Sequence, residues 1–199
     1  AVSDSRHFTV SPGTFPASIE LSALDGTDGC VINGIDATDQ SGFAVSNAGD
    51  VNADGIDDFI VGAFRADGTG TTDAGETYVV FGTSSGFGSS FELSSLNGTN
   101  GFTLHGVADV DVSGSAVSAA GDFNGDGIDD FLVGGYGIDA NGNASSGGSY
   151  VVFGSSNGFS SDLELSALNG SNGFAIDGID ADDNSGRYLS SAGDFNGDG

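Results

Sequence analysis

Three short acidic segments carry the side chains in this chain that are best suited to bind a cation. DVNADGIDD runs from Asp50 to Asp58, and DFNGDGIDD runs from Asp122 to Asp130. A third copy, DFNGDG, begins at Asp194 and ends at Gly199, the last residue. In both complete segments, oxygen-bearing side chains occupy positions 1, 3, 5 and 9, and glycine occupies position 6. Alternate positions of a tight loop point oxygens inward, and the glycine permits the sharp bend.

These loops predict calcium sites built entirely from oxygen atoms. Three carboxylates, one amide oxygen and one backbone carbonyl form a hard ligand set, which favours Ca²⁺ over transition metals and over Mg²⁺. Cation binding also relieves the repulsion between the crowded carboxylates. The expected ligands are Asp50, Asn52, Asp54, the carbonyl of Ile56 and Asp58 in the first loop, and Asp122, Asn124, Asp126, the carbonyl of Ile128 and Asp130 in the second.

The terminal copy offers only half of such a site. It supplies Asp194, Asn196 and Asp198 but lacks positions 7 and 9. We therefore expect this third loop to bind a cation weakly or not at all. Because the copy stops abruptly, we also expect the chain to be part of a longer protein.

Two other interpretations of the acidic loops fit the sequence less well. An EF-hand loop starts in the same way but needs a glutamate at position 12, where this chain has Val61 or Val133 inside strand-like runs. A single copy would also suit an ordinary hairpin turn, because Asp, Asn and Gly are typical turn residues. Two complete copies with the same ligand pattern favour the metal site over the turn.

The acidic loops belong to a longer internal repeat with a fixed period. The spacing from Asp50 to Asp122 equals the spacing from Asp122 to Asp194. The same offset aligns Glu20 with Glu92 and Glu164, and similar alignments continue outside the loops. We divide the chain into an unrepeated leader (1–14), two complete units (15–86 and 87–158) and a truncated unit (159–199).

The composition and the short apolar runs predict an all-β fold. The chain has 36 Gly and 15 Phe among its 199 residues, and its Val- and Phe-rich runs are separated by turn residues. About four antiparallel strands per unit, repeated at a fixed period, indicate β-propeller blades that must stack to cover their faces. Two and a half units predict an open, partial propeller.

Charge and composition exclude several classes of function. The chain carries 29 acidic and 3 basic residues, a formal net charge of −26, which is unsuited to binding nucleic acid or an anionic membrane. No apolar run approaches the length of a membrane span. No Ser/His/Asp set or other catalytic constellation recurs, so we expect no enzyme activity. The single cysteine, Cys30, aligns with Phe102 and Phe174, which indicates a buried apolar position.

The repeat unit resembles the FG-GAP repeat of integrin α-subunit β-propellers and their bacterial relatives. Phe81-Gly82 and Phe153-Gly154 match the Phe-Gly element, and Val61–Phe64 and Val133–Tyr136 match the Gly-Ala-Pro element without its proline. The resemblance implies a loop between the first two strands of each blade, with calcium bound there. The unit is longer than the family's usual repeat, and its ELSALNG-type segment is the expected addition.

The resemblance implies a calcium-binding segment of a secreted or cell-surface protein with an adhesive role. Its expected partners are calcium and an extracellular protein or glycan, bound through loops opposite or beside the metal loops. The alternative is a non-catalytic accessory module of a large secreted hydrolase, because such repeats also occur beside catalytic domains.

Two further sets of residues suit structural roles. His105 aligns with Asn33 and Asp177, which indicates a variable surface position and not a metal ligand. Asp39, Asp111 and Asp183 recur ahead of a Ser-Gly pair, where they suit a turn cap better than a second cation site.

Overall fold

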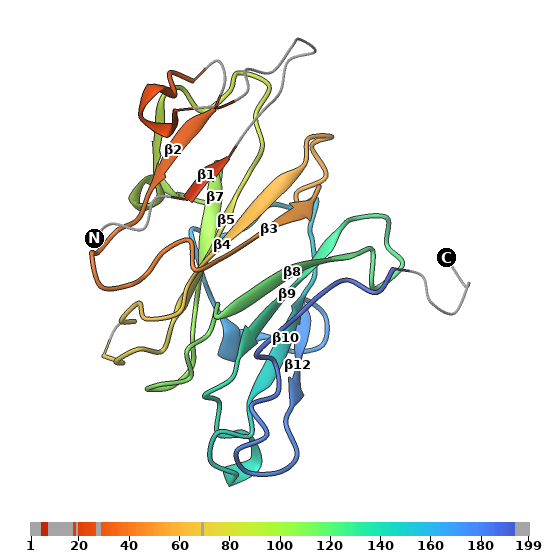
Figure 1. Ribbon diagram of the computed structural model, residues 1–199. Coiled ribbons are helices and arrows are strands. Elements are labelled where there is room, and N and C mark those ends of the chain that lie inside the picture. The colour runs from red at the N-terminus through yellow and green to blue at the C-terminus, as the bar shows by residue number, and fades with distance from the viewer. Residues whose placement is uncertain (1–4, 8–17, 19, 27–28, 69, 194–199) are drawn as a thin grey trace.

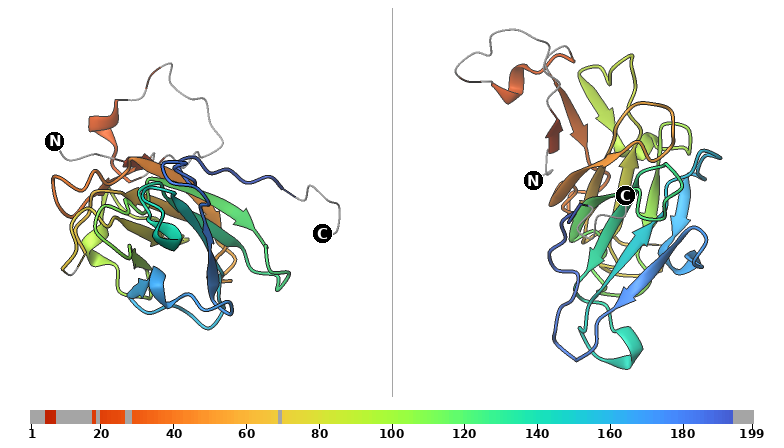
Figure 2. Two further views of the ribbon diagram at one scale, coloured as in Figure 1. Left: turned by 90° about the horizontal axis from the view of Figure 1, so that it is seen from below. Right: turned by 90° about the vertical axis from the view of Figure 1, so that its right-hand side faces the viewer.

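A computed structural model of the chain describes residues 5–7, 18, 20–26, 29–68 and 70–193 (Figure 1). Over these residues the fold is all-β, as predicted, and its only helical elements are short 3₁₀ turns. The strands form three sheets, named here the N-terminal, central and C-terminal sheets, and the central sheet lies between the other two (Figures 1 and 2). None of the described helical elements could cross a membrane.

The N-terminal sheet contains three strands in the order β1, β2, β6. β1 (Ser5–His7) pairs antiparallel with β2 (Cys30–Asn33), and β2 pairs in parallel with β6 (Ser90–Glu92). β1 lies in the unrepeated leader, most of which falls outside the described residues. β6 comes from the second sequence unit, so this sheet joins parts of the chain that are distant in sequence.

The central sheet contains four consecutive antiparallel strands and one parallel edge strand. β3 (Ala44–Gly49), β4 (Asp58–Ala63), β5 (Glu76–Val80) and β7 (Gly101–His105) pair antiparallel in that order, and β11 (Asp162–Glu164) pairs in parallel with β7. A bulge interrupts the β3–β4 register just before the first acidic loop. β7 and β11 belong to the second and third sequence units, so one sheet combines three units.

The C-terminal sheet repeats the antiparallel part of the central sheet. Its strands are β8 (Ala116–Gly121), β9 (Asp130–Gly135), β10 (Gly148–Val152) and β12 (Gly173–Asp177), and each begins at the residue that aligns with the start of its counterpart. The bulge before the acidic loop recurs between β8 and β9. Each of these two sheets therefore contains four antiparallel strands, but the fourth strand, β7 or β12, comes from the following sequence unit.

Apolar side chains on both faces of the central sheet explain why it lies between the other two. Ile60, Val79 and Phe102 face the C-terminal sheet and are fully buried, whereas the neighbouring Val61 and Tyr78 face the N-terminal sheet. A strand buried on both faces needs a nearly continuous apolar run, which the sequence FIV in β4 provides. Cys30 is buried in the N-terminal core, as predicted.

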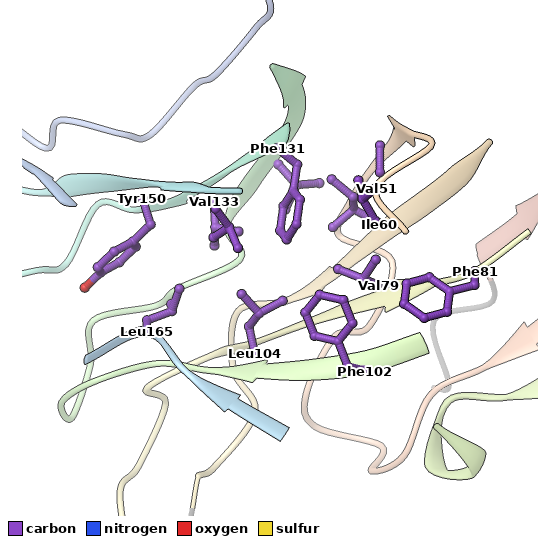
Figure 3. Close-up of a cluster of buried hydrophobic side chains, with 13 residues drawn as sticks. Val51, Ile60, Val79, Phe81, Phe102, Leu104, Phe131, Val133, Tyr150 and Leu165 are labelled. Carbon is purple, nitrogen blue, oxygen red and sulfur yellow. The ribbon is translucent and has the colours of Figure 1, made fainter. Parts of the chain in front are cut away.

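The core between the central and C-terminal sheets contains more buried apolar side chains than the other core, and Figure 3 shows it in close-up. Phe131, Val133 and Tyr150 project from the C-terminal sheet toward Val79, Phe102 and Leu104 of the central sheet, and Leu165 lies at one side of this layer. Phe102 also stacks on Phe159, with ring centroids 4.2 Å apart. This packing positions the two acidic loops, because β3 and β8, which lead into them, lie side by side.

The ELS segment of the repeat ties neighbouring sheets together. Each ELS segment forms a short strand, β6 or β11, followed by a 3₁₀ turn: η2 (Leu93–Ser95) or η4 (Leu165–Ala167). The turn η1 (Leu21–Ala23) lies in the aligned ELS segment of the first unit. The remaining turn, η3 (Ala140–Gly142), lies in the β9–β10 loop. Leu93 and Leu165 are almost fully buried, so each turn inserts a leucine into an inter-sheet core.

His105 holds one of these parallel strands in place and is not a free surface residue. Its Nδ1 lies 3.0 Å from Oε1 of Glu76 on β5, and its Nε2 lies 3.0 Å from Oδ1 of Asp162 on β11. The hydrogen bond to Glu76, reinforced by Asp162, raises the pKa of His105 to about 9 even though partial burial opposes it. A protonated imidazolium donates to both carboxylates, which links the edge strand β11 to β5 of the same sheet.

This bridge predicts a pH-dependent contribution to stability. The folded-state pKa of His105 lies above the unfolded value of about 6.5, so its contribution is fully present below pH 6.5 and is lost as the pH rises through 9. His105→Asn, which introduces the residue found at the aligned position 33, should lower the unfolding free energy by on the order of 2 kcal/mol at pH 6 and by little at pH 9.5. Urea denaturation of both proteins from pH 6 to pH 9.5 measures the difference in unfolding free energy. A difference that does not change with pH would contradict a protonated His105 in this bridge.

Candidate metal centres

The two complete acidic loops occupy equivalent positions in the central and C-terminal sheets. Residues 50–57 join β3 to β4, and residues 122–129 join β8 to β9, so each loop connects the first two strands of an antiparallel set. The third predicted site, Asp194, Asn196 and Asp198, lies outside the described residues.

Ligand positions 1 and 3 of the first loop converge on one backbone amide. The N–H of Asp54 donates both to Asp50 Oδ1 at 2.9 Å and to Asn52 Oδ1 at 2.8 Å, and Gly55 N–H donates to Asp50 Oδ2 at 2.9 Å. The Asp54 carboxylate accepts from Ile56 N–H at 2.9 Å and from the Asn52 side-chain amide at 3.1 Å. The side chains at positions 1, 3 and 5 therefore lie together inside the loop.

The second loop reproduces the backbone-to-side-chain hydrogen bonds of this arrangement. Asp126 N–H donates to Asp122 Oδ1 at 3.0 Å and to Asn124 Oδ1 at 2.9 Å, and Gly127 N–H donates to Asp122 Oδ2 at 2.8 Å. Ile128 N–H donates to Asp126 Oδ1 at 3.0 Å. The two loops thus share the same hydrogen-bonding pattern, which the shared sequence DxNxDG dictates.

The aspartate at position 9 is buried and closes each loop onto the end of the third strand. Asp58 is 2% exposed; its Oδ2 accepts from Val51 N–H at 3.0 Å and its Oδ1 from Gly82 N–H at 2.8 Å. Asp130 is fully buried and accepts in the same way from Phe123 N–H at 2.9 Å and Gly154 N–H at 2.8 Å. The Phe-Gly element therefore supplies the amide that anchors the acidic loop.

Burial of this carboxylate raises its pKa. The pKa of Asp58 is raised to about 7, chiefly by desolvation and also by the charges of Asp54 and Asp50, while the hydrogen bonds from Gly82 and Val51 act in the opposite direction. The pKa of Asp130 is raised for the same reason, burial, with the charge of Asp126 acting in the same direction. Burial therefore disfavours the charged form of the position 9 carboxylate in both loops.

Each Phe-Gly glycine is required by the close approach of the acidic loop. A Cβ on Gly82 would lie 2.3 Å from the carbonyl oxygen of Asp57 and 2.6 Å from Ile56 Cγ2. A Cβ on Gly154 would lie 2.4 Å from the carbonyl oxygen of Asp129. Any side chain at these positions would push the loop away from the strand end and break the hydrogen bond to the buried aspartate.

The donor atoms suit a hard cation, although the structure does not bring the whole predicted set to one point. Positions 1, 3 and 5 cluster, whereas the position 9 carboxylates face backbone amides; within the described residues no group of three or more His, Cys, Asp or Glu side chains is close enough to hold a metal ion. The clustered atoms are carboxylate and amide oxygens, which is the chemistry that Ca²⁺ prefers. By this criterion the residues fit calcium.

Comparison with protein-family models found no match for the chain. Comparison with curated proteins also found none.

The recurrent aspartates Asp39 and Asp111 are turn caps, as the sequence analysis favoured. Asp111 Oδ2 accepts from Ala108 N–H at 2.9 Å, and Asp39 Oδ2 accepts from Asp36 N–H at 3.3 Å. Both carboxylates are buried, and desolvation raises the pKa of each.

A cavity of about 440 Å³ lies at the end of the sheets opposite the acidic loops. It is formed by the β4–β5, β7–β8 and β9–β10 loops and by the segment after β12. Its walls combine aromatic rings, carboxylates and one guanidinium, among them Phe64, Arg65, Asp73, Val110, Tyr136 and Asp139. The sequence analysis named Phe64 and Tyr136 only as parts of the Gly-Ala-Pro-like elements and did not identify the cavity, because the cavity exists only where separate loops meet.

One wall of this cavity uses residues in an unfavourable backbone conformation. Val110 and Val112 have φ of 65° and 52°, a region that β-branched residues rarely adopt. The aligned residues of the next unit, Asp182 and Asn184, have nearly the same φ angles but types that tolerate them. The first of these valines is 60% exposed, so burial does not offset its conformational cost.

Replacing the aspartate at position 9 should destabilise the fold even without metal. In Asp58→Asn one carboxylate oxygen becomes an NH₂ group that faces a backbone donor, so one buried N–H loses its acceptor at a cost of about 1–3 kcal/mol. Asp57→Asn, at the adjacent exposed position, should change stability by less than about 0.5 kcal/mol. Urea denaturation at pH 8 with a chelator present compares the two; equal midpoints would contradict this role of Asp58.

Relieving the strained valine should stabilise the protein. Val110→Asn places a residue that tolerates positive φ at a mostly exposed position and should raise the unfolding free energy by about 0.5–1 kcal/mol. Val45→Asn is the matched control, because Val45 is 58% exposed but lies in β3, where the change should be neutral or destabilising. Equal effects of the two changes would show that backbone conformation does not decide the result.

Proposed function

We propose that this chain is a calcium-binding β-propeller segment of FG-GAP type from a secreted or cell-surface protein, with an adhesive or interaction role. The observation that carries the proposal is the pair of acidic loops with the same internal hydrogen bonds, each anchored by a buried aspartate to a Phe-Gly element. Turn residues alone do not require that buried carboxylate.

The sheet arrangement supports the propeller part of the proposal. In this reading the β3–β4–β5–β7 and β8–β9–β10–β12 sets are successive blades, which pack face to face through the larger core. The acidic loop of each set joins its first and second strands, which is the position that the resemblance implies. The short strands β6 and β11 would then be additions that each link one blade to the next.

Calcium binding would increase the stability of the folded chain. Without a cation, the carboxylates at positions 1, 5 and 9 of each loop repel one another, and the buried position 9 group is held at a raised pKa. A divalent cation would convert that repulsion into attraction and order the loop. The loops would therefore be stabilised outside the cell, where free calcium is abundant, and destabilised where it is scarce.

The interaction role is assigned to the end of the sheets opposite the acidic loops. The cavity there combines the rings of Phe64 and Tyr136 with the carboxylates of Asp73 and Asp139, a surface suited to a protein or glycan ligand. The strained Val110 at its edge supports this assignment, because backbone strain concentrates at binding sites.

Calcium should raise the melting temperature of the wild-type chain. At a free concentration 100 times its Kd, one bound ion stabilises the folded state by about 2.7 kcal/mol, which corresponds to roughly 5–10 °C for a chain of this size. The shift should disappear with chelator, and Mg²⁺ at the same concentration should produce less of it. Circular dichroism measures the transition.

The double variant Asp54→Ala/Asp126→Ala is the matched control for this titration. It removes position 5 from both loops and should abolish the calcium shift, while Asp67→Ala/Asp139→Ala removes an aligned pair of acids elsewhere and should retain it. A wild-type chain whose melting temperature is the same with millimolar calcium and with chelator would contradict the proposed function.

A further inference from the structure

The two acidic loops are in direct contact through a residue that the ligand pattern does not include. Asp129, at position 8 of the second loop, extends its carboxylate to the first loop, where Oδ2 accepts from the N–H of Asp50 at 2.9 Å. Asp50 is position 1 of the first loop and the first predicted calcium ligand. The second loop therefore holds the backbone of a ligand in the first, 79 residues away in sequence.

A second hydrogen bond connects the same two regions. Ser155, which follows the Phe-Gly element of the C-terminal sheet, donates its N–H to the carbonyl oxygen of Val51 at 2.8 Å. The preceding Gly154 donates to Asp130, the position 9 aspartate of the second loop. Positions 1 and 2 of the first loop are thus both attached to groups that the second loop positions.

The packing around Asp129 is close enough to constrain the neighbouring glycine. A Cβ on Gly49 would lie 2.2 Å from Asp129 Oδ2, so the carboxylate rests directly against the backbone that leads into the first loop. Gly121 is the aligned glycine of the second loop; its φ of 68° is close to the 75° of Gly49, but a Cβ there would meet nothing within 4 Å. Only the first loop is supported in this way among the residues that the structure describes.

From this geometry we infer that Asp129 is a positioning residue that couples the two loops, so that calcium binding at one raises calcium affinity at the other. The inference rests on the proposed calcium binding. Asp129 lies between Ile128 and Asp130, so a cation that orders the second loop also fixes the Asp129 carboxylate. That carboxylate orients the Asp50 backbone, and the Asp50 side chain holds the amides of the first loop.

The coupling is reciprocal by thermodynamic linkage. A cation in the first loop holds Asp50, which holds Asp129 and thereby orders the second loop. The wild-type chain should therefore bind two calcium ions with positive cooperativity, and the combined binding free energy should exceed the sum measured for the two loops separately.

The experiment uses the full chain and isothermal titration calorimetry with calcium chloride. Asp126→Ala leaves only the first loop competent to bind, and Asp54→Ala leaves only the second. Asp129→Ala should then be added to Asp126→Ala, the variant in which only the first loop binds. It should weaken the calcium affinity of that loop about tenfold, within the range of typical coupling between sites. The matched control adds Asp57→Ala to Asp54→Ala, the variant in which only the second loop binds. Asp57 occupies position 8 of the first loop and is exposed. Its replacement should leave the calcium affinity of the second loop unchanged.

In the otherwise wild-type chain, Asp129→Ala should abolish cooperativity while retaining two bound ions. Gly49→Ala and Gly121→Ala provide a second comparison in chelator, because both replace a glycine at positive φ and only the first meets Asp129. Gly49→Ala should lower the melting temperature more. Thermal melts also verify that each variant folds before it is titrated.

The possible failures are distinguishable. No calcium binding by the wild-type chain would overturn the proposed function, and the coupling with it. Calcium binding in which Asp129→Ala leaves the first loop's affinity and the cooperativity unchanged would overturn the coupling alone. An effect of Asp57→Ala on the second loop as large as that of Asp129→Ala on the first would also overturn it, since loss of any nearby charge would then explain both.

Discussion

The buried carboxylate at position 9 of each acidic loop is the interaction on which the other features of this structure depend. Asp58 and Asp130 each accept hydrogen bonds from the start of their own loop and from a Phe-Gly amide at the end of the third strand. A buried charge is tolerated only when it is paired or well hydrogen-bonded. The loop, the glycine and the strand ends are therefore constrained together, and a change in one is transmitted to the others.

Sheet packing determines where these anchored loops lie relative to one another. The central sheet buries apolar side chains on both faces, and the turns after β6 and β11 add Leu93 and Leu165 to the two cores. The short parallel strands also cover the outer edges of β2 and β7, which would otherwise offer unpaired backbone groups. Because the sheets stack in a fixed register, one acidic loop contacts the next.

Charged side chains link the repeats at two places, the acidic loops and the edge of the central sheet where His105 lies. At the acidic loops, several carboxylates are crowded together, and the buried one at position 9 has a raised pKa, chiefly because of desolvation. At the outer edge of the central sheet, His105 lies between Glu76 and Asp162 and takes up a proton, which offsets their negative charge locally. In a chain with so few basic side chains, the protonated imidazole holds acidic segments together at this edge, and the proposed calcium ions would do so at the loops.

Much of the fold could be predicted because it depends on short-range patterns. The sequence by itself determined the repeat period, the all-β class, the approximate strands and the positions of the acidic loops, since turn chemistry and alternating apolar residues act within a few residues. It also located the buried Cys30 and the turn caps Asp39 and Asp111. The internal geometry of each loop follows from the same local rules, which is why both copies agree.

Only the tertiary structure decided the contacts between segments that are distant in sequence. The parallel pairing of β11 with β7, the bridging role of His105, the contact of Asp129 with Asp50 and the cavity beside Val110 all depend on how units stack. Asp57 and Asp129 are both aspartates at position 8 of their loops, yet Asp57 is exposed whereas Asp129 supports the neighbouring loop. A local pattern cannot distinguish them, because the difference lies in which unit packs beside each one.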